Sequence, residues 1–197
     1  AGGYFQPLSL ATIAGATPDD WEVIVEDENW APATLRTDVD LVGVTAFTAS
    51  APRAYELSAI YREAGIPTVL GGVHGTMRRS EAAEHFDSVV LGEADDVWVD
   101  VIRDAEFGIG GIRAFYQGDR VSSFALPNRS VLHPKYRYGS IQIVRGCPRN
   151  CSFCSVPAFS GHAIRRQSLD VTMADLFGIK NRGIFFVDDN LPGYSQV

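Results

Sequence analysis

The chain has 197 residues, of which 46% are hydrophobic and 21% are charged, so it can form a packed core and is not an intrinsically disordered protein. Its three cysteines are too few for a disulfide scaffold, and its formal net charge of −7 argues against a general nucleic-acid binder. The sequence has neither an apolar run long enough to span a membrane nor the basic start of a signal peptide, and we expect a cytoplasmic protein.

Strand and helix patterns alternate through the first hundred residues. Apolar runs predict strands at residues 21–25, 41–47, 67–70 and 88–91, and the second run lacks the polar alternation of a half-exposed strand, which predicts a buried one. Helices are expected at 7–16, 80–86 and 97–105, and also between Ser50 and Gly65, where one apolar stripe has helical spacing: Ala54, Leu57, Ile60, Tyr61 and Ala64. The alternation predicts an α/β fold with a parallel, flavodoxin-like (Rossmann-like) sheet.

The opening helix has no strand before it in the sequence. In a doubly wound sheet of the flavodoxin kind, the strand that precedes the first helix lies inside the sheet. The first residue is also Ala1 and not Met. Together these two features predict that the sequence is a fragment whose first strand is missing.

Residues 108–139 are expected to connect two domains. A hairpin is predicted there, with strands at 112–116 and 121–124 around a turn at 117–119, and Pro127 and Pro134 disfavour a later helix. The pattern then restarts with a strand at 140–144, a loop at 146–161, a helix at 169–179 and a strand at 183–187. We therefore expect one domain at 1–107, a connector, and the start of a second domain at 140–197.

All three cysteines lie in one segment with the spacing Cys-x3-Cys-x2-Cys, as Cys147, Cys151 and Cys154. The surrounding residues 120–169 include eight basic residues and no acid, a pattern typical of a site for an anionic group. Thiolates bind iron well, and three of them leave one iron of a cubane cluster without a protein ligand. Two alternatives stay open: reduced thiols without a role, and a structural zinc site with His162 as the fourth ligand.

The cysteine loop follows a predicted strand and has Phe153 just before its third cysteine. In these features it resembles the loop of the radical S-adenosylmethionine (SAM) superfamily. The resemblance implies a partial TIM-type barrel in which Cys147, Cys151 and Cys154 hold a 4Fe–4S cluster whose open iron is chelated by SAM. It further implies reductive cleavage of SAM, an external electron donor such as flavodoxin or ferredoxin, and a place for Phe153 near the adenine. The alternative for Phe153 is a loop anchor in the core.

The second barrel strand is followed by Asp188, Asp189 and Asn190. In the superfamily the end of this strand faces the SAM amino group, usually through a Gly-Gly-Glu element, and this sequence departs from that pattern. Its Phe-Phe-Val-Asp-Asp-Asn form resembles a subgroup that carries a cobalamin domain. Because a carboxylate can accept hydrogen bonds from an ammonium group, the resemblance implies that these three residues bind SAM. The alternative is a strand-end turn, in which Asp and Asn are common.

Small and polar residues follow three strands of the first domain, where an open α/β sheet binds ligands. Neither a GxGxxG nor a Walker A motif is present, which disfavours a nucleotide site. With the cysteine loop, residues 5–107 resemble the cobalamin-binding domain of B12-dependent radical SAM proteins. The resemblance implies that the cobalamin tail inserts beside Thr45, Thr48, Gly71, Gly72, His74, Gly92 and Glu93.

Four histidines are present, and none is expected to ligate cobalt. The ligating histidine of related domains follows the first strand, which this sequence lacks, so His74 is interpreted as a pocket or loop residue. We expect ordinary packing or surface roles for His85, His133 and His162.

The leading hypothesis is a radical SAM enzyme that uses cobalamin to methylate an unactivated carbon of a small-molecule substrate, or else forms a ring or rearranges its substrate. The 197 residues alone are expected to be inactive, because two barrel strands cannot enclose a radical. One alternative is a radical SAM enzyme whose first domain does not bind cobalamin; a methylthiotransferase is disfavoured, since residues 1–146 have no cysteine. Another alternative, from a different class, is a zinc-stabilised binding module.

Overall fold

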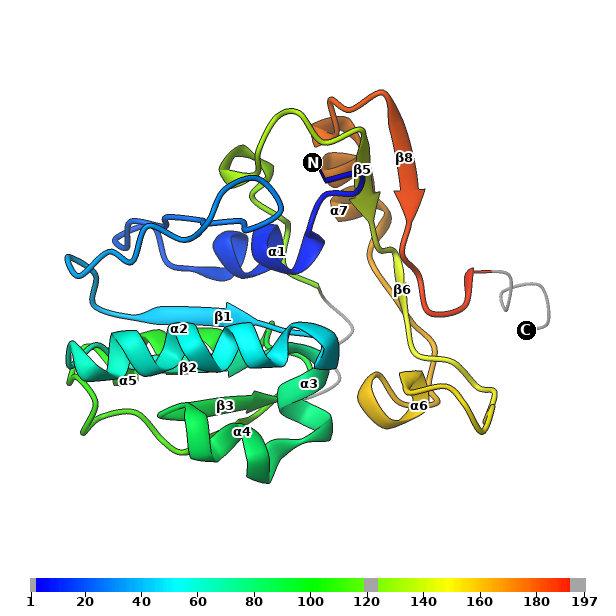
Figure 1. Ribbon diagram of the computed structural model, residues 1–197. Coiled ribbons are helices and arrows are strands. Elements are labelled where there is room, and N and C mark those ends of the chain that lie inside the picture. Colours follow the sequence, from blue (N-terminus) through cyan, green and yellow to red (C-terminus); the bar gives the residue numbers. More distant parts are fainter. Residues whose placement is uncertain (1–2, 119–123, 192–197) are drawn as a thin grey trace. The chain divides into compact units, whose positions relative to one another are not determined.

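The structure is a computed structural model that describes residues 3–118 and 124–191 (Figure 1). The chain divides into two compact units. We call residues Thr34–Asp119 the sheet unit, and residues Ala1–Ala33 with Arg120–Val197 the cysteine-loop unit. Within the described ranges, no helix is both long and apolar enough to cross a bilayer.

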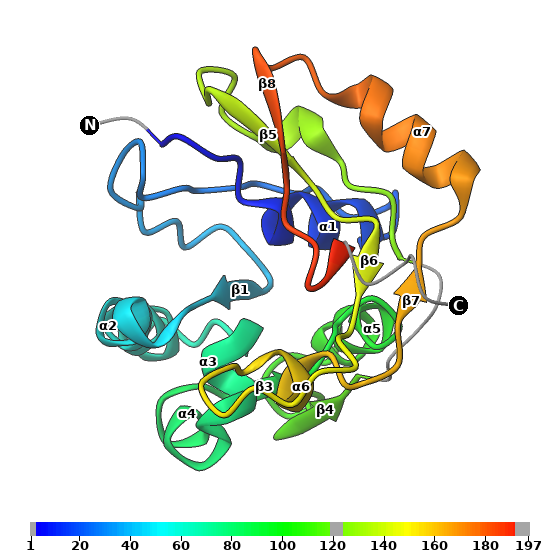
Figure 2. The same cartoon turned by 90° about the vertical axis from the view of Figure 1, so that its right-hand side faces the viewer.

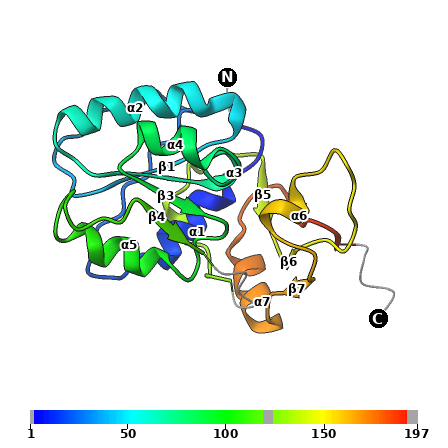
Figure 3. The ribbon, with the colours of Figure 1, turned by 90° about the horizontal axis from the view of Figure 1, so that it is seen from below.

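The sheet unit is built on four parallel strands in the order β1-β2-β3-β4. The strands are β1 (Val42–Thr45), β2 (Thr68–Gly71), β3 (Ser88–Leu91) and β4 (Phe115–Gln117). Between them lie η1 (Thr48–Ser50), α2 (Ala51–Glu63), α3 (Gly72–Met77), α4 (Arg79–His85) and α5 (Trp98–Ala105). Helices α2 and α4 cover one face of the sheet and α5 covers the other (Figures 2 and 3). The predicted parallel α/β fold is therefore confirmed.

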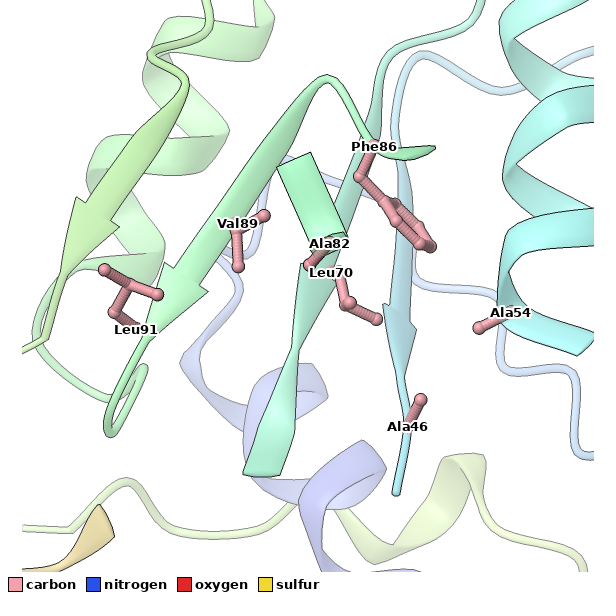
Figure 4. Close-up of a cluster of buried hydrophobic side chains, with 7 residues drawn as sticks. All are labelled: Ala46, Ala54, Leu70, Ala82, Phe86, Val89 and Leu91. Atoms are coloured by element: carbon pink, nitrogen blue, oxygen red, sulfur yellow. The ribbon is translucent and has the colours of Figure 1, made fainter. Parts of the chain in front are cut away.

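The core under α2 and α4 consists of small and aliphatic side chains and the ring of Phe86 (Figure 4). Leu70 of β2 and Val89 of β3 are fully buried, and Ala54 of α2 and Ala82 of α4 pack on them. Alanine at these two helix positions lets the helix backbones approach the sheet closely, and burying the larger side chains contributes roughly 1.5–3 kcal/mol each. This core fixes the strands whose ends carry the predicted ligand site.

Helix α2 agrees with its sequence signals at both ends, but its buried face differs from the predicted stripe. Pro52 lies in the first turn and Gly65 follows the helix with a φ of 78°. The buried positions are Ala51, Ala54, Ser58 and Tyr61, whereas Ile60 and Ala64 are exposed. Ser58 replaces an apolar residue in the stripe because its hydroxyl donates to the backbone oxygen of His85 at 2.7 Å and so remains satisfied when buried.

Two predictions for the sheet unit and its surroundings are wrong. Residues 21–25 form no strand, since a strand needs a neighbour and this segment pairs with none among the described residues. Strand β1 is an edge strand whose residues alternate between half-buried and exposed, so it is not buried on both faces. Strand β4 pairs in parallel with β3 and extends the sheet. Most of the second arm of the predicted hairpin, at 121–124, lies outside the described residues, so the hairpin stays a prediction.

The cysteine-loop unit contains a parallel pair of strands joined by a helix. Strands β5 (Tyr138–Ile141) and β8 (Gly183–Phe186) pair from Tyr138 opposite Gly183 to Ile141 opposite Phe186, with α7 (Leu169–Gly178) between them in the chain. The expected strand at 140–144 is split into β5 and β6 (Val144–Arg145), and β6 pairs antiparallel with β7 (Arg165–Arg166). The long loop between β6 and β7 contains one short helix, α6 (Val156–Phe159).

Helix α1 (Leu8–Ala16) forms as predicted, but it packs within the cysteine-loop unit. The backbone N–H of Asn128 donates to the oxygen of Ala11 at 2.8 Å, and a Cβ on Gly15 would lie 2.0 Å from the oxygen of Leu126. The compact units thus divide the chain after Ala33 and Asp119. The division into functional domains at 1–107 and 140–197 stays a prediction.

Arg129 joins three parts of the cysteine-loop unit. It lies in η2 (Arg129–Val131), and its guanidinium donates to both oxygens of Asp175 in α7 at 2.6 and 2.9 Å. It also donates to the side-chain oxygen of Gln6 at 3.0 Å and to the backbone oxygen of Ser140 at 2.7 Å. Because both Arg129 and Asp175 have only 8% of their side chains exposed, this pair is a buried tie between elements distant in sequence.

Candidate cofactor sites

The carboxyl ends of β1, β2 and β3 lie together at one edge of the sheet, which we call the strand-end edge. Parallel pairing puts Thr45 opposite Gly71. Beyond the strands, the N–H of Ala46 donates to the oxygen of Gly71 at 3.4 Å, and the N–H of His74 donates to the oxygen of Ala46 at 3.2 Å. The structure therefore brings together the predicted residues that follow β1 and β2.

Two glycines at this edge have backbone conformations that require glycine. Gly72 has a φ of 90°, and a Cβ there would lie 2.8 Å from Oγ1 of Thr45. Gly92 has a φ of 78°, and its Cβ would lie 3.2 Å from the oxygen of Gly118. Gly71 differs from both, because a Cβ on it would meet only the oxygen of Val44 at 4.0 Å. A side chain at Gly71 would thus fill open space at the edge without straining the backbone.

Thr76 connects the ends of β2 and β3 and was not predicted from the sequence. Its hydroxyl donates to the oxygen of Gly72 at 3.1 Å and accepts from the N–H of Gly92 at 2.9 Å. Only its place two residues after His74, in the stretch that follows β2, could have suggested a role. Through this hydroxyl, Gly92 after β3 is joined to Gly72 after β2, so the structure brings the two predicted glycines together.

His74 lies in α3 and is 1% exposed, so it is a buried residue and not a loop residue. Its Nε2 lies 2.6 Å from the hydroxyl of Tyr55, and its Nδ1 lies 3.3 Å from Oγ1 of Thr48. The Tyr55 hydroxyl also donates to Oε1 of Glu81 at 3.1 Å. Burial, helped by the Glu81 carboxylate, raises the pKa of Tyr55 to about 12. Both ring nitrogens of His74 are engaged in this network.

The outer surface of the strand-end edge carries hydroxyls and one aromatic ring. Thr45 and Thr48 are exposed, and the Phe47 side chain between them is 71% exposed. Glu93 is instead 5% exposed, and its backbone oxygen leaves room for nothing larger than glycine at position 118. An exposed phenyl ring beside two hydroxyls offers both apolar contact and hydrogen bonds to a large amphipathic ligand.

The three cysteines occupy one loop between β6 and α6, with different exposures. Cys147 is buried and its N–H donates to the oxygen of Gly161 at 3.0 Å, whereas Cys151 and Cys154 are exposed. In the described part of the chain, no three histidine, cysteine or acidic side chains are gathered as metal ligands. The donor set nevertheless fits an iron–sulfur cluster, because three thiols within eight residues, two of them facing solvent, can turn toward one centre.

The start of the cysteine loop is held by the residues that follow β8. Gly146 has a φ of 88°, and a Cβ there would lie 2.1 Å from the oxygen of Ala163. Its N–H donates to Oδ2 of Asp189 at 2.7 Å. Asp189 is predicted from the sequence as a SAM ligand, and the structure gives it a contact that positions the cysteine loop.

Asp188 lies beside β5 and β6 and is half-buried. Its Oδ1 accepts from the N–H groups of Ile143 and Val144 at 2.9 and 2.5 Å, and its Oδ2 is buried without a hydrogen-bond partner among the described residues. Burial raises the pKa of Asp188, although the two backbone donors work against this shift. An unpartnered carboxylate oxygen is the kind of atom that a cationic ligand group would satisfy. Binding of SAM by Asp188, Asp189 and Asn190 stays a prediction.

Phe153 and the remaining histidines occupy places that sequence patterns only partly predicted. Phe153 is 90% exposed, so its alternative role as a core anchor is wrong. His85 stacks on Tyr55 and His133 stacks on Trp30, each with ring centroids 3.9 Å apart. His162 is exposed.

Comparison with known proteins identifies the first part of the chain. The family model of the B12 binding domain matches residues 1–102. Bacteriochlorophyllide d C-8(2)-methyltransferase of Chlorobaculum tepidum is 31% identical over 171 residues, which cover 81% of this chain and 38% of that protein. Bacteriochlorophyllide d C-12(1)-methyltransferase of the same organism is 29% identical over 216 residues, covering 97% and 45%.

A third relative has a different kind of substrate in its name. Hopanoid C-2 methylase of Rhodopseudomonas palustris is 27% identical over 202 residues, covering 96% of this chain and 38% of that protein. The chain therefore spans less than half the length of these three curated relatives. The model match includes β1, β2 and β3 with their carboxyl ends, where the sequence predicts the cobalamin site. The chain belongs to the B12-binding domain family.

Proposed function

We propose that these 197 residues are part of a cobalamin-dependent radical SAM methyltransferase that acts on a small-molecule substrate in the cytoplasm. The observation that carries the proposal is the occurrence, in one chain, of a B12-binding domain match and a Cys-x3-Cys-x2-Cys loop that follows β5 and β6. Methylation is favoured over ring formation or rearrangement, because the three relatives described above are named methyltransferases or methylases.

The strand-end edge is the proposed place for cobalamin. Gly71 leaves open space there, Gly72 lets the backbone turn sharply, and Thr45, Phe47 and Thr48 present two hydroxyls and a ring at the surface. These residues would contact and orient the ligand, and β1, β2 and β3 hold them in place. The match to the B12-binding model favours cobalamin over the alternative of a first domain that does not bind it.

The cysteine loop is the proposed place for a 4Fe–4S cluster held by Cys147, Cys151 and Cys154. When bound, the cluster would receive an electron from an external donor such as flavodoxin or ferredoxin and pass it to SAM, while cobalamin would supply the methyl group. The residues of the chain itself would bind and orient. Asp189 holds the start of the loop, and the unpartnered carboxylate oxygen of Asp188 would accept a hydrogen bond from an ammonium group.

Cobalamin binding by a glycine variant tests the first part of the proposal. Gly71→Leu should weaken cobalamin binding by at least about tenfold, because its side chain would fill the space that the ligand needs. Gly110→Leu is the matched control, since a Cβ on Gly110 meets nothing within 4 Å and lies away from the strand ends, after α5. Equal cobalamin affinity in wild type, Gly71→Leu and Gly110→Leu would show that the ligand does not bind at this edge.

Anaerobic metal analysis tests the second part. Reconstitution should load about four irons and four sulfides per chain, and changing any one of the three cysteines to Ala should abolish the loading. Stoichiometric zinc without sulfide, in protein purified without oxygen, would instead support the zinc-stabilised binding module and contradict the cluster.

A further inference from the structure

A line of hydrogen bonds behind Thr48 reaches from solvent to the strand-end edge. It runs from Oε1 of Glu81 to the Tyr55 hydroxyl at 3.1 Å, from there to Nε2 of His74 at 2.6 Å, and from Nδ1 of His74 to Oγ1 of Thr48 at 3.3 Å. The Glu81 side chain is 50% exposed and Thr48 is exposed, whereas His74 between them is buried. All four residues lie in the sheet unit.

The number of hydrogens in this line sets its direction. A carboxylate can only accept, so the contact with Glu81 uses the single hydrogen of the Tyr55 hydroxyl. At 2.6 Å the tyrosine oxygen must then accept from Nε2 of His74, because two lone pairs facing each other at that distance would repel. A neutral imidazole with its hydrogen on Nε2 has a lone pair on Nδ1, so Nδ1 accepts the hydroxyl hydrogen of Thr48.

The direction of the line determines whether the Thr48 hydroxyl can donate to or accept from a ligand at the strand-end edge. Nδ1 of His74 is the one side-chain partner of the Thr48 hydroxyl among the residues that the structure describes. With its hydrogen directed inward, the hydroxyl presents lone pairs outward. A ligand donor such as a primary amide N–H would meet a partner there, whereas a carboxylate or phosphate oxygen would meet another acceptor.

We propose that Glu81, Tyr55 and His74 fix Thr48 as a hydrogen-bond acceptor and thereby select a carboxamide, and not a carboxylate or phosphate, at this position of the strand-end edge. The inference rests on the proposed function, since the carboxamides in question are those on the rim of the corrin ring of cobalamin. The three residues behind Thr48 are positioning residues, because they act on the ligand only through the orientation of one hydroxyl.

The test reverses the direction of these hydrogen bonds by a substitution at Glu81, the residue at the solvent end. Glu81→Met removes the acceptor that competes for the Tyr55 hydrogen, which can then go to Nε2 of His74. The imidazole hydrogen then moves to Nδ1, and Thr48 accepts from Nδ1 and directs its own hydrogen outward. Glu84→Met is the matched control, since it removes the same charge from the same helix, whereas the carboxylate that accepts from Tyr55 is that of Glu81.

Nitrogen NMR of the ligand-free protein reports the tautomer directly. The imidazole of His74 should carry its hydrogen on Nε2 in wild type and in Glu84→Met, and on Nδ1 in Glu81→Met. An Nδ1–H tautomer in wild type, or an unchanged tautomer in Glu81→Met, would overturn the inference. An Nε2–H tautomer in a wild-type protein that does not bind cobalamin would support the direction of the line and contradict the proposed function.

Ligand discrimination provides the second measurement. Wild type should bind at least one monocarboxylic derivative of cobalamin, in which one peripheral amide is hydrolysed to a carboxylate, roughly tenfold more weakly than cobalamin itself, the factor expected for one unsatisfied acceptor pair. Glu81→Met should bring this ratio close to one. A Thr48 hydroxyl that donates outward can pair with the oxygen of an amide or with that of a carboxylate. The inference is contradicted if wild type binds all the derivatives as tightly as cobalamin, or if Glu84→Met changes the ratio as much as Glu81→Met.

Discussion

The start of the cysteine loop depends on a glycine with a positive φ and on two carboxylates that follow β8. Gly146 has a positive φ and packs closely against the backbone of Ala163. The carboxylate of Asp188 accepts from the N–H of Ile143, and that of Asp189 accepts from the N–H of Gly146. Neither property depends on the cysteines themselves. The loop can therefore be tested for its shape separately from its thiols.

Gly146→Ala should destabilise the protein by more than about 2 kcal/mol. The positive φ alone costs roughly 1–2 kcal/mol for a residue with a Cβ, and here the Cβ would also lie 2.1 Å from a backbone oxygen that cannot rotate away. Gly108→Ala separates the two contributions, because Gly108 has a φ of 67° with nothing within 4 Å. Denaturant unfolding should give a clearly smaller loss for Gly108→Ala; equal losses would show that the contact with Ala163 relaxes.

The raised pKa of Asp188 gives the folded protein a defined pH dependence. An acid whose pKa is higher in the folded than in the unfolded chain stabilises the fold below its unfolded pKa of about 3.9, and this contribution is lost as the pH rises through the folded pKa. The unfolding free energy of wild type relative to Asp188→Asn should therefore fall as the pH rises above the unfolded pKa of about 3.9. Asp19→Asn, which removes a carboxylate at an exposed site, is the control measured over the same pH range. A constant or rising difference for Asp188→Asn would mean that the carboxylate is not desolvated.

At the scale of elements, the cysteine-loop unit depends on Arg129, which ties η2 to α7 and to β5. Arg129→Met should cost about 3–5 kcal/mol, because it leaves the Asp175 carboxylate buried without its cation. Arg129→Met combined with Asp175→Leu should recover much of this loss, since no unpaired charge remains.

The control for the buried pair is Arg103→Met, which removes an exposed ion pair and should cost no more than about 1 kcal/mol. Thermal and denaturant unfolding of the four proteins measure these differences, and an Arg129→Met protein as stable as Arg103→Met would contradict the role of the tie.

Elements were predictable from the sequence where local signals and the neighbouring strands agree. The strand Ser88–Leu91 was predicted with its correct bounds, because it lies between neighbours and is buried throughout. Residues 21–25 have equally strong strand residues but no partner strand among the described residues, and pairing is a property of the whole sheet that a local pattern does not contain. Likewise no local pattern predicted that β4 pairs in parallel with β3, which lies more than twenty residues earlier in the chain.

The candidate site divides in the same way between what the sequence can and cannot predict. The glycines and threonines at the strand ends, and the spacing of the cysteines, were found because each is a local pattern. Tyr55, Thr76 and Glu81 were missed, because they are ordinary helix residues until the fold brings them to His74 and to the glycine turns.

At the scale of the whole molecule, the two proposed cofactor sites lie in different compact units. Loading of one should therefore survive damage to the other. Cys151→Ala should lose iron and sulfide but bind cobalamin within about twofold of wild type, and Gly71→Leu should show the reverse. Iron analysis and cobalamin titration of both variants measure this, and loss of both cofactors in either variant would show that the two sites depend on each other.

The composition of the cysteine-loop unit from two separate stretches, 1–33 and 120–197, has a consequence for how the chain acquires its structure during synthesis. The sheet unit is contiguous and has all its residues once position 119 has left the ribosome, so it can fold first. Helix α1 is made earlier, but Asn128, whose N–H donates to the oxygen of Ala11, is made only after more than a hundred further residues. Until then the side of α1 that carries Ala11 and Gly15 lacks the segment on which it packs in the structure, for the whole time that the sheet unit is being translated.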